Sequence, residues 1–184
     1  ENPDNMLEAQ AAIAGPLLSS QAALIVNNRT GEVLYQKNMH RVMPIASISK
    51  LMSAMVVLDA RLNMNEVITI TEDEIDRLKG TGSRLSVGTQ LTRAQLLHLS
   101  LMSSENRATH ALGRTYPGGM SAFVAAMNAK AQSLGMTNSR FYEPTGLDYR
   151  NVSTAWDLNK LAAAASNYAP ITKNSTATYG SVYT

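Results

Sequence analysis

The run from Leu51 to Leu58 constrains the fold more than any other feature of the sequence. Every residue in it except Ser53 is apolar. A helix that is apolar on all sides is normally buried, so we expect a central helix from about Ser47 to Leu62. Lys50 lies at the start of this run. Because burying an ammonium group costs several kcal/mol unless something pairs with it or uses it, this lysine requires an explanation.

A serine three residues before the lysine suggests that explanation. Ser47 and Lys50 form the pattern S-x-x-K and share one helix face. The helix N-terminus favours negative charge that develops near Ser47, and apolar surroundings lower the pKa of a lysine. A neutral lysine can take the proton of a nearby serine hydroxyl and make it a nucleophile for acyl transfer. By itself the pattern carries little weight, since it occurs about once by chance in a chain of this size.

A second polar motif lies between two expected helices. The first of these helices runs from about 92 to 102, and the second follows the motif and ends at about 116. The stretch "L-M-S-S-E-N-R-A" presents Ser104 and Asn106 as S-x-N. Taken alone, it fits a corner between helices with Ser104 as an N-cap. However, S-x-x-K followed by an S-x-N-type motif and K-T-G is the motif set of serine β-lactamases and penicillin-binding proteins. Two of the three motifs occur here, in that order.

Further stretches extend this similarity along the chain. They are "I-A-S-I-S-K-L-M", "S-R-L-S-V-G", "L-L-H-L-S-L-M-S-S-E-N-R-A", "A-M-N-A-K-A-Q-S-L-G-M" and "E-P-T-G-L-D". With them the chain resembles the low-molecular-mass penicillin-binding proteins, the serine D-alanyl-D-alanine peptidases, from an expected β-hairpin at 21–38 to a helix that ends near 167. The segment "M-S-S-E-N-R-A" followed by "Y-P-G-G" is most similar to the penicillin-binding protein 7 branch, the D-alanyl-D-alanine endopeptidases.

The resemblance implies a fold and a set of site residues. The fold is α+β, of the β-lactamase/DD-peptidase-like transpeptidase type, with a helical region packed on an antiparallel sheet. Ser47 would be the nucleophile that forms the acyl-enzyme, and Lys50 its general base. Ser104 would relay a proton towards the leaving amine. Asn106 would hold the peptide backbone of the substrate and help to place Lys50.

The resemblance also implies a substrate and partners. Peptidoglycan peptides would be cut at D-alanyl–diaminopimelate cross-links, and β-lactam antibiotics would acylate Ser47. The alternative activity is that of a carboxypeptidase, which releases terminal D-alanine. No cofactor is expected. The family also implies a periplasmic protein whose signal peptide has been removed.

The third motif, K-T-G, is missing. The nearest string, "K-G-T-G" at 79–82, precedes the S-x-N motif and is therefore rejected. An isolated hairpin is marginally stable and needs further strands. Both observations predict that residues 1–184 form one penicillin-binding domain that stops before its last sheet strands. We then expect a C-terminal fragment of the same protein as a possible partner, and no activity without it.

Composition excludes several other functions. The net charge is +2 with no cluster of Lys and Arg, which disfavours nucleic acid, and no apolar run is long enough to span a membrane. The chain has no cysteine, and its histidines lack a metal-binding spacing, so no metal is expected. The acidic run from Glu72 to Glu74 fits a solvated first helical turn that opens with a capping box.

Two rival hypotheses remain. A class A β-lactamase shares the first two motifs but needs a glutamate to activate the deacylating water, and Glu143 is the candidate. The surrounding "E-P-T-G-L-D" resembles the peptidase loop instead. The second rival is a non-catalytic binding or scaffold protein that keeps the fold and has lost the third motif.

Overall fold

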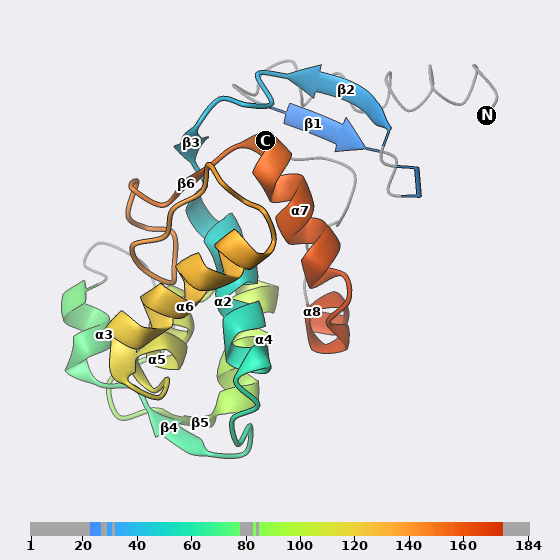
Figure 1. Ribbon diagram of the computed structural model, residues 1–184. Helices are drawn as coiled ribbons and strands as arrows, with labels where there is room; N and C mark the ends of the chain where they lie inside the picture. Colours follow the sequence, from blue (N-terminus) through green and yellow to red (C-terminus); the bar gives the residue numbers. More distant parts are fainter. Residues whose placement is uncertain (1–22, 27–28, 31, 78–82, 84, 175–184) are drawn as a thin grey trace.

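The computed structural model describes residues 23–26, 29–30, 32–77, 83 and 85–174 (Figure 1). Its helices are η1 (Ala46–Ile48), α2 (Ser49–Asp59), α3 (Glu72–Arg77), α4 (Arg93–Ser103), α5 (Asn106–Arg114), α6 (Gly119–Ser133), α7 (Ala155–Ala165) and α8 (Ala169–Asn174). Its strands are β1 (Ala23–Val26), β2 (Val33–Lys37), β3 (Met43–Pro44), β4 (Val67–Thr69), β5 (Gln90–Thr92) and β6 (Val152–Ser153).

Helix α2 lies at the centre of the helical body (Figure 1). It contacts α4, α5, α6, α7 and α8, and every residue from Ser49 to Val57 is buried. The predicted central helix is therefore confirmed, although it ends at Asp59 and is preceded by the 3-10 turn η1. The side chains around it form one continuous core, whose largest fully buried members include Met52, Met55, Leu96, Leu112, Phe123, Met127, Phe141 and Leu161.

The strands form three separate two-stranded antiparallel sheets. Strands β1 and β2 pair in the predicted hairpin, and β1 packs against α7. Within the described part of the chain, no other strand joins this hairpin. The string at 79–82 lies outside the described residues.

The shortest sheet joins two distant segments close to Ser47. Strand β3 pairs with β6, so that Pro44 lies opposite Val152. The next residue, Ile45, continues the contact because its N–H donates to the Asn151 carbonyl at 3.0 Å. These bonds fix the backbone just before Ser47 against the end of a loop that follows α6.

The first turn of α3 contains a correction. Glu74 was expected in a solvated turn, but it is fully buried, with 0% exposure. Its carboxylate lies 2.9 Å from His110 Nδ1 and accepts from Arg114 at 2.9 Å. Burial alone would raise the pKa of Glu74, but these partners hold it below its usual value. The sequence could not reveal this because both partners lie on α5, far along the chain.

No helix in the described ranges is long and apolar enough to cross a membrane.

Met127 on α6 provides a test of the core. Its side chain is 0% exposed, so Met127→Ala is expected to lower the free energy of unfolding by about 2–5 kcal/mol through lost burial and a residual cavity. The control is Met102→Ala on α4, where the side chain is 41% exposed and the loss should stay within about 0.5 kcal/mol. Urea unfolding followed by circular dichroism measures both, and equal losses would contradict the described core.

Candidate active site

Ser47 lies at the entrance to α2. It is the exposed middle residue of η1. Helix α2 follows, and the first turn of α2 is buried. The residue before Ser47, Ala46, has φ +46°, which a residue with a Cβ adopts only at a cost. Such strain persists only where the surrounding structure holds it, and it is concentrated at functional sites.

Lys50 is buried one turn further on, as its apolar surroundings predicted. Only 4% of it is exposed, and its Nζ donates to the Thr145 carbonyl at 3.1 Å. Burial lowers the pKa of Lys50 below its usual value, while the charges of Glu143 and Glu105 partly oppose this. The predicted direction of the shift is therefore found, and its cause is desolvation.

The S-x-N motif forms the turn between α4 and α5. Ser104 is exposed and caps the C-terminus of α4 with a left-handed φ of +49°, while Glu105 is the N-cap of α5. The alternative interpretation of Ser104 as an N-cap is thus wrong. Asn106 begins α5, and its Oδ1 is buried without a hydrogen-bond partner among the described residues. This atom is an acceptor that faces no donor of the described chain.

The structure brings the two motifs to one end of α2. The charge of Glu105, which lies between Ser104 and Asn106, acts on Lys50, and α2 contacts both α4 and α5. Within the described residues, no hydrogen bond joins any two of the four predicted side chains. Their catalytic roles therefore stay predictions, while the burial of Lys50 and the neighbouring S-x-N turn are structural facts.

The segment 142–151, here called the 142–151 loop, covers the start of α2. The loop accepts two hydrogen bonds from α2. Lys50 Nζ donates to the Thr145 carbonyl, and Ser53 Oγ donates to the Pro144 carbonyl at 2.7 Å. In return, Asn151 Nδ2 donates to Ser49 Oγ at 3.1 Å. Ser49, Lys50 and Ser53 are thus the polar side chains in the buried part of α2, and the loop provides a hydrogen-bond partner for all three. Sequence reasoning missed this, although the lone Ser53 in the apolar run was a signal.

Gly146 brings the backbone of the loop close to Ala46, the residue before Ser47. Its φ is +86°, and a Cβ at this position would lie 1.7 Å from the Ala46 carbonyl oxygen. Only a residue without a side chain fits there. The loop backbone is therefore in contact with the residue that precedes Ser47.

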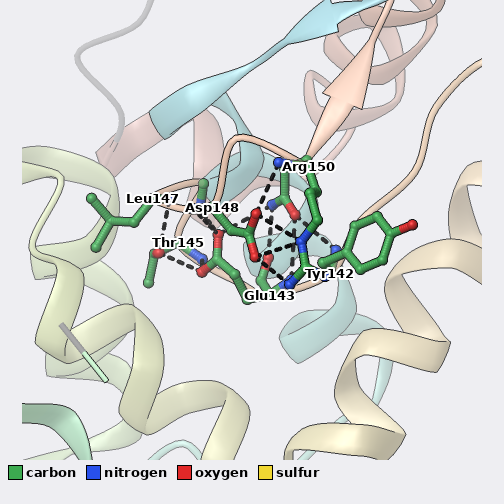
Figure 2. Close-up of polar contacts among 8 residues, drawn as sticks. Tyr142, Glu143, Thr145, Leu147, Asp148 and Arg150 are labelled. Atoms are coloured by element: carbon green, nitrogen blue, oxygen red, sulfur yellow. Dashed lines mark hydrogen bonds and ion pairs between the residues drawn. The ribbon is translucent and has the colours of Figure 1, made fainter. Parts of the chain in front are cut away.

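The carboxylate of Glu143 faces into its own loop (Figure 2). One oxygen accepts from the Gly146 N–H at 2.5 Å and the other from the Thr145 N–H at 2.6 Å. A glutamate that activates water in a class A β-lactamase needs an acceptor oxygen free for that water. The geometry thus disfavours that role for Glu143.

Comparison with known proteins shows the family to which the chain belongs. Residues 8–183 match a family described as D-alanyl-D-alanine carboxypeptidase. The chain is 52% identical over 159 residues to a D-alanyl-D-alanine endopeptidase of Pseudomonas aeruginosa, which covers 86% of this chain and 51% of the relative. It is 49% identical over 168 residues to a D-alanyl-D-alanine endopeptidase of Escherichia coli, covering 91% of this chain and 54% of the relative. The chain therefore spans about half the length of these curated relatives.

Solved structures share the fold. The DD-transpeptidase of Streptomyces K15 has a TM-score of 0.76 at 29% identity, covering 83% of this chain and 62% of that one. A D-alanyl-D-alanine carboxypeptidase from Mycobacterium tuberculosis has a TM-score of 0.72 at 30% identity, covering 83% and 58%. The expected α+β arrangement, with helices packed against antiparallel strands, is thus confirmed.

The contact between Gly146 and Ala46 generates a stability prediction. Gly146→Ala is expected to lower the free energy of unfolding for two reasons. A residue with a Cβ is strained at this left-handed φ, which costs roughly 1–2 kcal/mol, and the clash with Ala46 costs a further ~1–3 kcal/mol. Gly88→Ala is the matched control, because its φ is +90° and nothing lies within 4 Å of the added Cβ. Urea unfolding of both variants isolates the contact, and equal losses of stability would show that the loop does not press on Ala46.

The burial of Lys50 generates a titration prediction. NMR of the chain labelled with ¹³C-lysine should show Lys50 losing its proton below the usual pKa of 10.5. Lys130 is the internal control, because burial lowers its pKa but bonds with Tyr168 and Asp59 outweigh this and raise it above 10.5. Lys50→Arg and Lys130→Arg assign the signals. A Lys50 midpoint at or above that of Lys130 would contradict the desolvated site.

Proposed function

Because the chain belongs to the D-alanyl-D-alanine carboxypeptidase family of serine peptidases, we propose that it acts on peptidoglycan peptides through an acyl-Ser47 intermediate. One observation carries the proposal. Lys50 is buried with a lowered pKa, three residues after the exposed Ser47. A lowered pKa increases the fraction of the lysine that is neutral, and the neutral amine is the base that a serine nucleophile needs.

The acylation step uses the start of α2. Ser47 Oγ attacks the carbonyl carbon of a D-alanyl residue while Lys50 Nζ takes the hydroxyl proton. The Ser47 backbone N–H supplies half of an oxyanion hole for the tetrahedral intermediate, a contribution worth roughly 3 kcal/mol where both donors are present. The Thr145 carbonyl holds the lysine nitrogen during this transfer.

Release of the leaving group uses the turn between α4 and α5. The bond from the D-alanyl carbon to the leaving nitrogen breaks, and Ser104 relays the proton from Lys50 to that nitrogen. Asn106 holds the substrate backbone, and its unpartnered buried Oδ1 is an acceptor for the Lys50 ammonium that forms. Water then attacks the acyl carbon, and hydrolysis of the ester frees Ser47.

The preferred substrate is a cross-linked peptide. The relatives at 52% and 49% identity are D-alanyl-D-alanine endopeptidases, which supports cleavage of D-alanyl–diaminopimelate cross-links in the cell wall. The carboxypeptidase alternative rests on the family description. Digestion of a cross-linked muropeptide dimer beside a monomeric pentapeptide separates the two activities. A cell-wall substrate also supports a location in the periplasm, and hydrolysis of the cell wall there would act on cell shape.

A complete site also needs the K-T-G motif. We place it in a C-terminal part of the same protein, which would add strands to the β1–β2 hairpin, the lysine that binds the substrate carboxylate, and the second oxyanion donor. The non-catalytic scaffold alternative predicts a full-length gene product without K-T-G. Sequencing of the complete gene decides between them.

Benzylpenicillin provides the direct test. Incubation of the full-length gene product is expected to add the mass of one penicillin, on Ser47, because the β-lactam mimics the acyl donor. The 184-residue chain should acquire the adduct only together with a fragment that carries K-T-G. Intact-mass spectrometry and peptide mapping measure both.

Two variants control this experiment. Ser47→Ala is expected to abolish the adduct, whereas Ser121→Ala, which removes an exposed hydroxyl on α6, should leave it unchanged. An adduct on another serine, or one that survives Ser47→Ala, would overturn the assignment of the nucleophile.

A further inference from the structure

The carboxylate of Glu143 is the point around which the tip of the 142–151 loop is folded (Figure 2). One oxygen accepts from the N–H groups of Gly146 at 2.5 Å and Asp148 at 3.3 Å. The other accepts from the Thr145 N–H at 2.6 Å and from the Thr145 hydroxyl. Hydrogen bonds to an ionised carboxylate are stronger than neutral ones. The backbone between 143 and 148 therefore takes its shape from this side chain.

Thr145 connects this shape to Lys50. Its N–H and its hydroxyl donate to Glu143, while its carbonyl accepts from Lys50 Nζ at 3.1 Å. The position of the Glu143 carboxylate thus determines where the acceptor of the lysine lies. The neighbouring Pro144 carbonyl, which is bonded to Ser53, anchors the same stretch one helical turn further along α2.

The base of the loop has a separate support. Asn151 Oδ1 accepts from the Tyr142 N–H at 2.7 Å, and Asn151 Nδ2 donates to the Glu143 carbonyl at 2.8 Å. On the outer side, Arg150 pairs with Asp148 at 2.7 Å and lies over the Tyr142 ring. Of these groups, only the Asn151 amide also reaches the Glu143 carboxylate, with its Nδ2 3.3 Å from one carboxylate oxygen. A change at that carboxylate therefore acts chiefly on the tip of the loop, while the bonds of Asn151 with the Tyr142 N–H and the Glu143 carbonyl still hold its base.

Two negative charges act on the Lys50 ammonium. Glu143 approaches from the loop and Glu105 from the turn between α4 and α5, and both oppose the effect of burial. The charge of Glu143 raises the pKa of Lys50 more than the charge of Glu105 does. Glu143 also holds the backbone of Thr145, whose carbonyl accepts from Lys50. Geometry and charge thus converge on one residue that no sequence motif assigned.

We propose that Glu143 is a positioning residue for Lys50: its carboxylate folds residues 143–148 so that the Thr145 carbonyl holds the lysine nitrogen at the entrance to α2. The proposal rests on the proposed function, in which Lys50 is the base that activates Ser47. Glu143 itself touches neither substrate nor Ser47 in this role. It acts through the Thr145 backbone and through its charge.

The experiment measures the pKa of Lys50 by ¹³C-lysine NMR in the unsubstituted chain and in Glu143→Gln. The variant removes the charge and turns one acceptor into a donor, so the pKa of Lys50 should fall further. A carboxylate that only stabilised the loop would, on removal, admit water to Lys50 and raise its pKa towards 10.5. A rise, or no change, overturns the proposal. Asp148→Asn is the matched control, which removes a charge from the same loop and should leave the Lys50 pKa unchanged.

A second readout is the pH profile of Ser47 acylation by benzylpenicillin in the full-length gene product. In Glu143→Gln the acid limb should move to lower pH and the plateau rate should fall by about tenfold to a hundredfold, as a misplaced base requires. Thr145→Ala keeps the charge and the carbonyl but removes one donor to Glu143. Thr145→Ala should lower the plateau rate of acylation without moving the acid limb of the pH profile. An unchanged plateau rate in Thr145→Ala counts against the positioning role of Glu143, even where Glu143→Gln does not fold.

The two readouts separate this proposal from the proposed function. The NMR titration needs no substrate, so it tests the coupling of Glu143 to Lys50 in any case. Failure of the unsubstituted full-length protein to acylate at Ser47 refutes the proposed function alone. Acylation that is insensitive to both variants refutes the positioning role alone.

Discussion

The hydrogen bond from the Lys50 ammonium to the Thr145 carbonyl is the interaction on which the rest of the site depends. It joins two residues that are 95 positions apart, at 3.1 Å, in a buried environment. Without an acceptor, a buried ammonium would be strongly destabilising. The loop that supplies this acceptor must therefore be held in place, and most of the polar contacts around the entrance to α2 serve that purpose.

The same helix provides both the centre of the core and the polar part of the site. Met52 and Met55 are fully buried among the surrounding helices, whereas Ser49, Lys50 and Ser53 bind the 142–151 loop. Tight packing fixes the helix, and the helix in turn fixes the three polar side chains. A site on a rigid buried element holds its geometry better than one carried by loops alone. The acceptor of Lys50 comes from a loop, and that loop is bound at its tip and at its base.

Much of the helical framework was predictable because its signals are local. The helix after Thr92 and the helix after Thr154 begin at threonines whose side chains cap them, and the apolar run after Lys50 had to be buried. The buried state of Glu74 was missed because it depends on His110 and Arg114, which a local pattern of acidic residues cannot reveal. Helix α8 was also missed, since a helix of six residues has little periodicity.

The site shows the same division between local and distant causes. The S-x-x-K and S-x-N spacings identified side chains, because motifs record side-chain identity. The acceptor of Lys50 is a backbone carbonyl, and any residue at position 145 carries one. Its importance follows only from the fold of the loop, and the residue that fixes this fold, Glu143, was considered at first for a different role.

The bonding of Glu143 separates two kinds of chemistry that share the first two motifs. An ionised carboxylate offers about four lone-pair positions. Here three donors lie on one oxygen, from Gly146, Asp148 and Asn151, and two lie on the other, both from Thr145. No position is left for a water that would attack an acyl-serine. A carboxylate used in this way can hold Lys50 through the Thr145 backbone, but it has no lone pair free to activate a water. Under the proposed function, the loop geometry therefore gives an acyl-Ser47 no help from Glu143 in deacylation, which is the step that separates a β-lactamase from a peptidase that penicillin inactivates.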